Sequence, residues 1–318
     1  MTGDPELAAR LVSRLRLPVM AGPMFIASTP ALVVAQCRSG IIGSMPALNA
    51  RTTSALDAGI ALIERELEGC RVPYAINLVA HRTNARLDAD LEVVLRYEVP
   101  IVVLALAANP GIVESVHAYG GLVFNDVASD RHARKCAETG VDGIIAVAAG
   151  AGGHTGSTSP FALVQEIREW WEGPLLLAGC IATGRAVLAA ETLGADFAYI
   201  GSPFLASVEA NTPPAFKRMV VDGSAKDIIV TKSFTGARAS FLGPSLLANG
   251  LDPEALAKAE SARVDISGGG SNPKAWRDIW SAGQGIGAVK VSAPAAEYID
   301  ALAAEYARAR ESMVARLS

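Results

Sequence analysis

Eight apolar runs recur along the first two thirds of the chain, and this rhythm constrains the fold more than any other feature. The runs begin at Pro18, Gly40, Pro73, Pro100, Gly121, Asp142, Pro174 and Phe197. Their starts lie about 21 to 33 residues apart, with helix-length segments between them. Continuous apolar runs are typical of strands buried on both faces of a parallel sheet. Eight such βα units predict an α/β fold, a TIM barrel, and their number disfavours the alternative, a doubly wound open sheet.

The rhythm changes after the eighth run. Residues 209–275 contain Pro-rich turns and short helical pieces, with "SGGGSNP" near the end, and they predict a small, mostly helical insertion domain on the substrate side. Within it, the strand-like segment "DIIVTKSF" is expected to cross back toward the barrel. The chain closes with an amphipathic helix that we expect to cover the barrel wall. Residues 1–208 and 276–318 are therefore expected to form the barrel domain.

Composition excludes several other classes of protein. Hydrophobic residues make up 51% of the 318 residues and aromatic residues only 6%, as in a large α/β core. The net charge is −4 and the basic residues are scattered, so nucleic acid is not an expected partner. The longest apolar run, "VPIVVLALAA", is too short to span a bilayer, and the N-terminus lacks the pattern of a signal peptide. These features predict a soluble cytoplasmic protein that does not associate with membranes.

The four cysteines give no sign of a metal site. Cys37, Cys70, Cys136 and Cys180 lie far apart and form no CxxC pair. A disulfide framework or a metal cluster is therefore not expected, and reduced, mostly buried thiols fit the cytoplasmic prediction.

Glycines at the ends of the last two runs predict a phosphate site. The active site of a TIM barrel lies at the carboxyl ends of its strands, and the loops after the seventh and eighth strands often bind phosphate. The seventh run ends in "AGCIATG", where Gly179 allows close approach and Gly184 opens a helix. The eighth ends at Gly201 and Ser202, which offer backbone N–H groups and a hydroxyl. Tight turns without a ligand are the alternative interpretation.

The loop after the sixth run, "AVAAGAGGHTGSTSP", carries a candidate catalytic histidine. His154 follows a buried strand at the catalytic face, among glycines that let a ligand approach. An imidazole there could act as an acid or a base near neutral pH. A lone histidine is more often structural, and His81, His117 and His132 lie in segments that favour that alternative.

Several motifs occur together in an order that resembles the nitronate monooxygenase family, formerly called 2-nitropropane dioxygenases. They are "PVMAGPM", "YAINL", "GAGGHTG", "LLLAGCIATG", "YIGSPFL" and "WSAGQG", between Pro18 and Gly287. The resemblance implies an FMN-containing TIM barrel with a small extra domain. The combination is specific, although no single motif would be.

The resemblance also implies which residues hold the cofactor. Those implied to lie along the flavin ring are Ala21, Gly22, Met24, Asn77, Ala149, Gly150, Gly152, Gly153, Gly283 and Gln284. Those implied to bind the FMN phosphate are Gly179, Cys180, Ile181, Ala182, Gly201 and Ser202. His154 is implied to lie in the substrate site.

The implied reaction is the oxidation of an alkyl nitronate by O₂ to a carbonyl compound and nitrite, through a flavin semiquinone. His154 would orient or stabilise the anionic nitronate, or deprotonate a neutral nitroalkane. The expected partners are this small molecule and O₂. A homodimer is compatible with the sequence.

The chain departs from the family's pattern at several positions. Many members have glycine where this chain has Cys180 and threonine where it has Ser202, and both replacements keep their backbone N–H groups. In "TKSFTGARASFLGP", relatives often show Thr-Gly-Arg followed closely by another Arg, and Arg238 is the arginine that remains here. This last difference lies on the substrate side, so it bears on the substrate more than on the cofactor.

Three other functions fit the same residues. The first is an FMN-dependent NAD(P)H:quinone or enoyl-thioester reductase on this scaffold. The second is a flavin-free TIM-barrel lyase or isomerase that binds a phosphorylated substrate. The third is a flavin-binding protein without catalytic activity.

Overall fold

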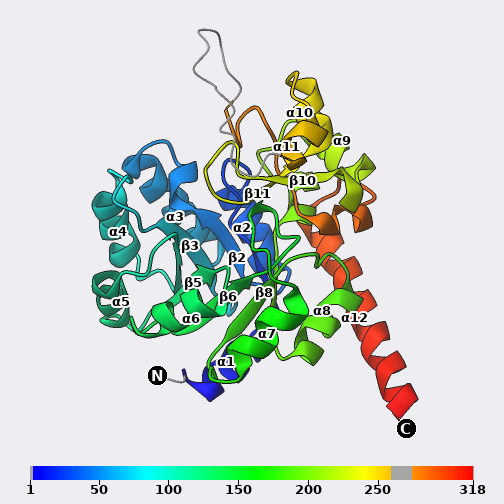
Figure 1. Cartoon of the computed structure of the whole chain (residues 1–318). Coiled ribbons are helices and arrows are strands. Elements are labelled where there is room, and N and C mark those ends of the chain that lie inside the picture. The colour runs from blue at the N-terminus through cyan, green and yellow to red at the C-terminus, as the bar shows by residue number, and fades with distance from the viewer. Residues whose placement is uncertain (1–2, 259–273, 318) are drawn as a thin grey trace.

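The structure is a computed structural model that describes residues 3–258 and 274–317. All eight apolar runs form parallel strands of one sheet at the centre of the molecule (Figure 1). The strands are β1 (Val19–Ala21), β2 (Gly43–Pro46), β3 (Tyr74–Val79), β4 (Ile101–Ala105), β5 (Leu122–Val127), β6 (Gly143–Val147), β8 (Leu175–Ala178) and β9 (Phe197–Ile200).

The sheet closes on itself. Its order is β1-β9-β8-β6-β5-β4-β3-β2. Met20 of β1 then forms a parallel bridge with Ile42, just before β2. The Ala21 N–H donates to the Ile42 carbonyl over 2.7 Å, and the Ile42 N–H donates to the Val19 carbonyl over 3.1 Å. The predicted TIM barrel is therefore confirmed.

Helices cover the outside of the barrel. They are α2 (Pro30–Arg38), α3 (Thr53–Glu66), α4 (Leu87–Arg96), α5 (Pro110–His117), α6 (Asp130–Ala137), α7 (Pro160–Arg168) and α8 (Gly184–Leu193). Most begin after a side chain that accepts a hydrogen bond from the first turn and satisfies an otherwise unpaired N–H. These capping residues are Thr29, Thr52, Asn109, Ser129 and Thr183.

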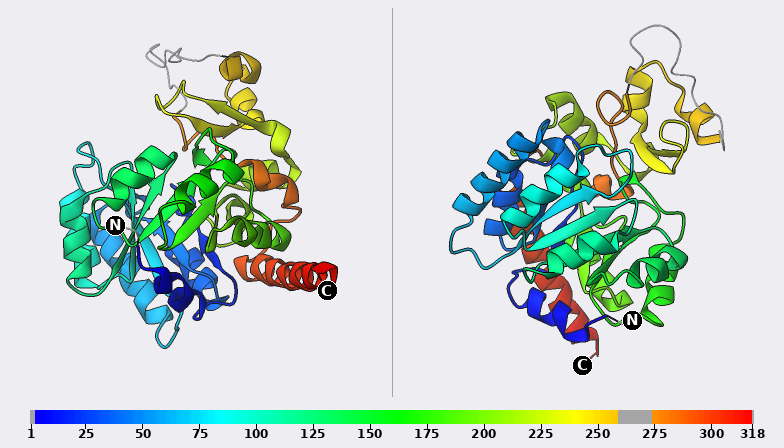
Figure 2. Two further views of the ribbon diagram at one scale, coloured as in Figure 1. Left: turned by 60° about the horizontal axis from the view of Figure 1, so that its bottom comes forward. Right: turned by 90° about the vertical axis from the view of Figure 1, so that its left-hand side faces the viewer.

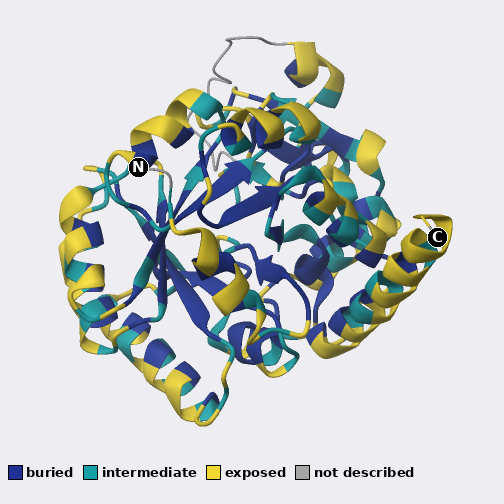
Figure 3. Ribbon diagram, turned by 90° about the horizontal axis from the view of Figure 1, so that it is seen from below, coloured by how far each residue is buried: buried dark blue, intermediate teal, exposed yellow. Residues whose placement is uncertain are grey.

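The hydrophobic core has two layers, inside and outside the barrel. Seen along the barrel, the buried strands radiate at the centre and the helices turn their exposed faces outward (Figure 3). Inside, Met20, Phe124 and Phe197 are fully buried. Leu7 and Leu11 of α1 (Pro5–Val12) pack against this interior set, so α1 plugs the amino ends of the strands.

The segment after β9 stands over the opposite end of the barrel (Figure 2). Its elements are η2 (Ser202–Ala206), α9 (Pro214–Asp222), η3 (Ala225–Asp227), β10 (Ile228–Thr231), β11 (Ala239–Leu242), α10 (Gly243–Ala248) and α11 (Pro253–Lys258). Besides the predicted helices, β10 and β11 form an antiparallel pair, and β10 comes from the strand-like "DIIVTKSF". Residues 259–273, with "SGGGSNP", lie outside the described residues. The division into two domains remains a prediction.

The final helix, α12 (Ala295–Leu317), crosses the barrel wall and contacts the loop after β8. The Tyr298 hydroxyl donates to the Ala182 carbonyl over 2.9 Å. The Gly184 N–H donates to the Glu305 carboxylate over 3.1 Å. A Cβ atom at Gly184 would lie 2.1 Å from the Tyr306 nitrogen, so only glycine lets the two helices meet this closely. The C-terminal helix thus fixes a loop on the catalytic face.

Across the described ranges, no helix is long and apolar enough to cross a membrane.

Replacing Gly184 with alanine should destabilise the protein. The added Cβ atom would overlap the backbone of α12, and overpacking of this kind costs about 1–3 kcal/mol. Gly111 is a matched control because it also lies in the first turn of a helix, where its Cβ would meet nothing closer than 3.4 Å. Thermal unfolding of both variants measures the difference. Equal melting temperatures for Gly184→Ala and Gly111→Ala would contradict this account of the contact.

Candidate active site

A cavity of about 440 Å³ opens at the carboxyl ends of the strands. This volume lies within the usual range for small-molecule sites. Its floor comes from the last inward-facing residues of the strands, and its walls come from the loops that follow β1, β2, β6, β8 and β9 and from residues 276–285. The cavity therefore lies where TIM-barrel enzymes place their active sites.

Most of the predicted site residues lie along this cavity. Those that line it are Gly22, Met24, Asn77, Gly150, Gly152, Gly153, His154, Gly179, Cys180, Ile181, Gly201, Ser202 and Gly283. The structure does not place Ala21, Ala149, Ala182 or Gln284 on the cavity wall. Ala21 is fully buried. The backbones of Ala149 and Gln284 hydrogen-bond to neighbouring loops, and the Ala182 carbonyl accepts from Tyr298 of α12.

The loops after β8 and β9 form a cradle of backbone donors, residues 179–182 and 201–202. Within the described chain, the N–H groups of Cys180, Ile181, Gly201 and Ser202 donate no hydrogen bond. Gly179 has φ +130°, and a Cβ there would lie 2.8 Å from the Ala149 carbonyl oxygen. Unpaired N–H groups beside the start of α8 favour an anion. The cradle can therefore hold a phosphate without a basic side chain.

Cys180 adopts a backbone conformation that favours glycine. Its φ is +59°, in the left-handed region, which costs an ordinary residue roughly 1–2 kcal/mol. Cys180 is exposed and forms no disulfide. The atoms around its thiol still exclude part of the water, and this desolvation raises the pKa of the thiol. It is therefore a neutral wall group.

Two glycine loops pack backbone against backbone beside the cradle. A Cβ atom at Gly283 would lie 2.7 Å from the Gly150 carbonyl oxygen, and one at Gly152 would lie 2.9 Å from the Gly283 nitrogen. The Gly283 N–H donates to the Ser202 hydroxyl over 2.7 Å, and the Gln284 N–H donates to the Gly150 carbonyl over 2.9 Å. These glycines therefore permit the contact between the loops.

His154 is held over the cavity by the insertion. Residues Gly153–His154 form the short strand β7, which pairs with β11 so that His154 lies opposite Ala239 and Gly153 opposite Ser240. The imidazole is open to the cavity, and within the described chain it makes no hydrogen bond. The cavity walls still displace water, and this desolvation lowers the pKa of His154. The ring is therefore neutral at pH 7, with both nitrogens available to a ligand.

Two aromatic side chains lie in a row beside the histidine. The centroid of Trp276 lies 5.5 Å from that of His154 and 5.2 Å from that of Phe241. Trp276 has φ +71°, a strained value for a bulky residue. Trp276 could not be identified from the sequence, because its spacing from the other site residues follows no motif. Arg238, expected on the substrate side, is exposed outside the cavity lining, and its carbonyl accepts from the Thr155 N–H.

The floor of the cavity carries one carboxyl group. Asp126, the residue before the last of β5, lies near Tyr199 of β9. The Asn77 amide donates to the Val103 carbonyl over 3.1 Å. Burial raises the pKa of Asp126 to about 6, against the opposing effect of the Leu106 N–H. In the sequence, Asp126 lies in the apolar run that begins at Gly121, and no motif marks it as a site residue.

The mouth of the cavity is apolar. Phe25 and Leu106 line it with 49% and 62% of their surfaces exposed. Leu106 has φ +71°, so strained backbone presents this exposed leucine to the cavity. An apolar substituent on a substrate could pack here.

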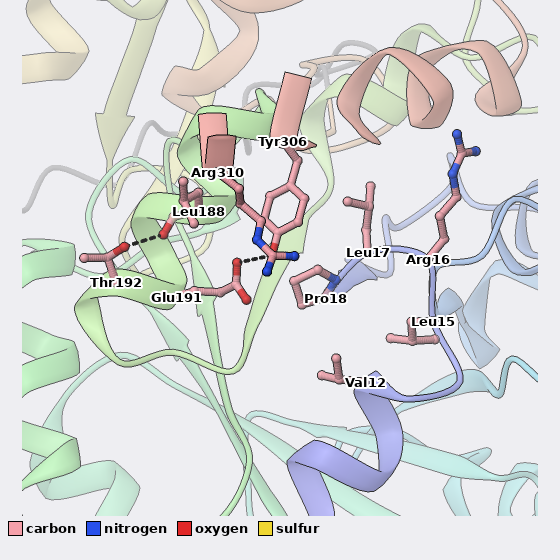
Figure 4. Close-up of a pocket in the computed structure, with 10 residues that line it drawn as sticks. All are labelled: Val12, Leu15, Arg16, Leu17, Pro18, Leu188, Glu191, Thr192, Tyr306 and Arg310. Atoms are coloured by element: carbon pink, nitrogen blue, oxygen red, sulfur yellow. Dashed lines mark hydrogen bonds between the residues drawn. The ribbon is translucent and has the colours of Figure 1, made fainter. Parts of the chain in front are cut away.

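A second cavity, of about 540 Å³, lies at the other end of the barrel between α1, α8 and α12 (Figure 4). Its polar groups are already paired: the Tyr306 hydroxyl donates to Glu191 over 2.6 Å, and the Arg310 guanidinium lies 5.7 Å from the centre of the Tyr306 ring. Although it is larger, it lies at the amino ends of the strands and has no glycine loop. It is therefore a weaker candidate for a catalytic site.

Comparisons with known proteins point to one family. The family model described as nitronate monooxygenase matches residues 69–305. A nitronate monooxygenase of Paraburkholderia phytofirmans is 27% identical over 74% of this chain and 76% of its own length. The 5-hydroxy-7a-methyl-1-oxo-octahydro-1H-indene-4-carboxyl-CoA dehydrogenase of Rhodococcus jostii is 26% identical over 69% of this chain and 60% of its own length.

Among solved structures, FabK from Thermotoga maritima has a similar fold, with a TM-score of 0.79 at 25% identity. The superposition covers 96% of this chain and 98% of that one. The chain spans only 41%, 60% and 61% of the length of the first three curated relatives that it matches.

The His154 imidazole should titrate below the ordinary histidine value of about 6.5, because the cavity desolvates its charged form. Below that value the unfolded chain binds a proton that the folded chain resists, so this residue should lower stability as the pH falls. NMR titration of the ring carbons measures the pKa, and His154→Asn assigns the signal. A midpoint at or above 6.5 would show that the cavity does not desolvate the ring.

Proposed function

We propose, because this chain belongs to the nitronate monooxygenase family, that it uses FMN and O₂ to oxidise alkyl nitronates to carbonyl compounds and nitrite. The chain is a flavin-dependent oxidoreductase, and its substrate and its form of flavin are the proposed part. The observation that carries the proposal is a single cavity in which a cradle of unpaired backbone N–H groups and a neutral histidine face the same space.

The residues present fit FMN. Its phosphate needs several donors and room for close approach, and residues 179–182 and 201–202 supply unpaired N–H groups beside glycines. The rest of the cavity offers Met24, Asn77 and the glycine loop at 150–153 as neutral walls for a flat ring system. FMN, when bound, would supply the electron transfer between substrate and O₂.

The protein's own contribution is orientation and electrostatics. A neutral His154 carries one N–H group, and this group can donate a hydrogen bond to an anionic nitronate oxygen. The pairing of β7 with β11 fixes the backbone of His154, and Trp276 supports its ring. Positioned donors of this kind typically contribute about 100-fold or more to the rate. The apolar mouth at Phe25 and Leu106 would receive the alkyl part of the substrate.

Purified holoenzyme mixed with ethyl nitronate should consume O₂ and release nitrite. His154→Asn should lower kcat/KM by about 100-fold or more, with little change in FMN content, because the cradle is built from other residues. His132→Asn is the matched control, since His132 is exposed on α6 outside the cavity. Oxygen electrode traces and nitrite assays give the rates. An unchanged kcat/KM in His154→Asn would show that this histidine has no catalytic role.

Gly179→Ala should weaken FMN binding. Its φ of +130° disfavours any side chain, and the new Cβ would press on the Ala149 carbonyl and shift the cradle. Gly120→Ala is the matched control, because Gly120 has φ +85° but no atom near its Cβ and lies far from the cavity. We expect at least a tenfold rise in the Kd of FMN for Gly179→Ala alone, measured by fluorescence titration of the apoprotein. Equal values for both variants would count against the cradle as the phosphate site.

A reductase is the second candidate. The family resemblance extends to a carboxyl-CoA dehydrogenase over 69% of this chain, and the apolar mouth would also admit a larger substrate. The two candidates differ in what reduces the flavin. Under argon, ethyl nitronate should bleach the flavin absorbance faster than NADH does. Rapid bleaching by NADH without O₂ uptake on nitronate would favour the reductase, and a colourless protein that cannot be loaded with FMN would favour the flavin-free lyase or isomerase.

A further inference from the structure

Asp126 is an acid of intermediate exposure in the cavity, and the proposed reaction has no use for it. It follows Phe124 by two residues on β5, so its side chain points into the barrel as that of Phe124 does. Its carboxyl lines the cavity, and the described chain contains no ion pair to it. An unpaired carboxyl in such a place needs an explanation, because burying a charge without a partner is unfavourable.

The groups around Asp126 offer little compensation for its charge. Tyr199 of β9 faces it across the floor, Cys136 of α6 lies behind it, and His154 of β7 lines the same cavity. All three are neutral at pH 7, since burial or desolvation raises the pKa of Tyr199 and Cys136 and lowers that of His154. The Leu106 N–H is the neighbouring group that stabilises the charged form. The strained backbone of Leu106 accompanies that contact.

The cradle, Asn77 and Asp126 line one continuous cavity. The cradle follows β8 and β9, whereas Asn77 lies within β3 on the far side of the barrel mouth. Tyr199 and Asp126 belong to the floor between them. A flat ring that extended from the cradle toward Asn77 would pass over the part of the cavity that Asp126 lines.

We propose that Asp126 places a titratable negative charge against the bound flavin ring and lowers the reduction potential of the cofactor. The inference rests on the proposed use of FMN. Reduction of the ring adds two electrons and one or two protons, and the one-proton form carries an extra negative charge. An ionised carboxyl nearby opposes that charge, more strongly in a cavity that excludes water than in solution. Charge near the ring is one of the means by which a protein tunes a flavin.

A lower reduction potential of the flavin would favour its reaction with O₂. A reduced cofactor made less stable passes its electrons to O₂ more readily. Asp126 carries its charge above a pH of about 6 and loses it below, so the effect should be present at neutral pH and fade in acid.

The test is the midpoint potential of the holoenzyme, titrated with dithionite and a reference dye under argon at pH 8 and pH 5. Asp126→Asn should shift the midpoint to more positive values at pH 8, by at least a tenfold change in the relative affinity for reduced and oxidised FMN. For a two-electron couple this is about 30 mV. At pH 5 the difference from the wild type should shrink, because the wild-type carboxyl is then protonated. Asp126→Glu should resemble the wild type and serves if the asparagine variant does not fold.

Asp88→Asn is the matched control, since Asp88 is an exposed acid of α4 outside the cavity. It should leave both midpoints unchanged. Equal midpoints for Asp126→Asn and the wild type at pH 8 would overturn the inference, as would a shift of the same size at both pH values. A protein that binds FMN but does not oxidise nitronate would contradict the proposed function while leaving this test intact. A protein that binds no FMN would overturn both.

Discussion

The contact between the two glycine loops is the constraint on which the rest of the site depends. Residues 150–153 follow β6, and residues 281–285 lie far along the chain, beyond the insertion. Their backbones meet at Gly152 and Gly283 with no space for a side chain. Through this contact the Ser202 hydroxyl reaches the Gly283 N–H, and the Ser281 hydroxyl accepts from the Gly153 N–H over 2.9 Å. One close approach thus joins the cradle, the histidine loop and the return from the insertion into a single wall.

The barrel was predictable because its signal recurs eight times along the first two thirds of the chain. Strands buried on both faces must be apolar throughout, so each strand can be recognised from its own residues alone. The closing bridge between β1 and β2 follows from having eight strands. The pairing of β7 with β11 was not predictable, because it joins two residues to a strand some 85 positions later, beyond the reach of any local pattern. For the same reason the sequence anticipated a strand in "DIIVTKSF" but not its partner.

The candidate site was predictable wherever backbone geometry left a mark in the sequence. Glycine at 150, 153 and 179 records positive φ, and a motif can carry that information. Trp276 and Asp126 left no such mark, because their importance comes from what packs against them in three dimensions. The same limit explains the placement of Ala21, Ala149, Ala182 and Gln284. A motif predicts that a loop approaches a ligand, but not which of its residues faces the cavity and which faces the adjoining loop.

The two titratable groups that share the cavity are shifted in opposite directions, and their shifts have one cause. Removal of water penalises charge on both, so it lowers the pKa of His154 and raises that of Asp126 to about 6. At neutral pH the cavity therefore holds a neutral donor, His154, on one side and the Asp126 carboxylate at its floor. The Asp126 carboxylate repels an anionic substrate from the floor, whereas the imidazole presented by β7 can donate a hydrogen bond to it. The same desolvation would therefore help to orient the proposed nitronate, with its anionic oxygens toward His154 and away from Asp126.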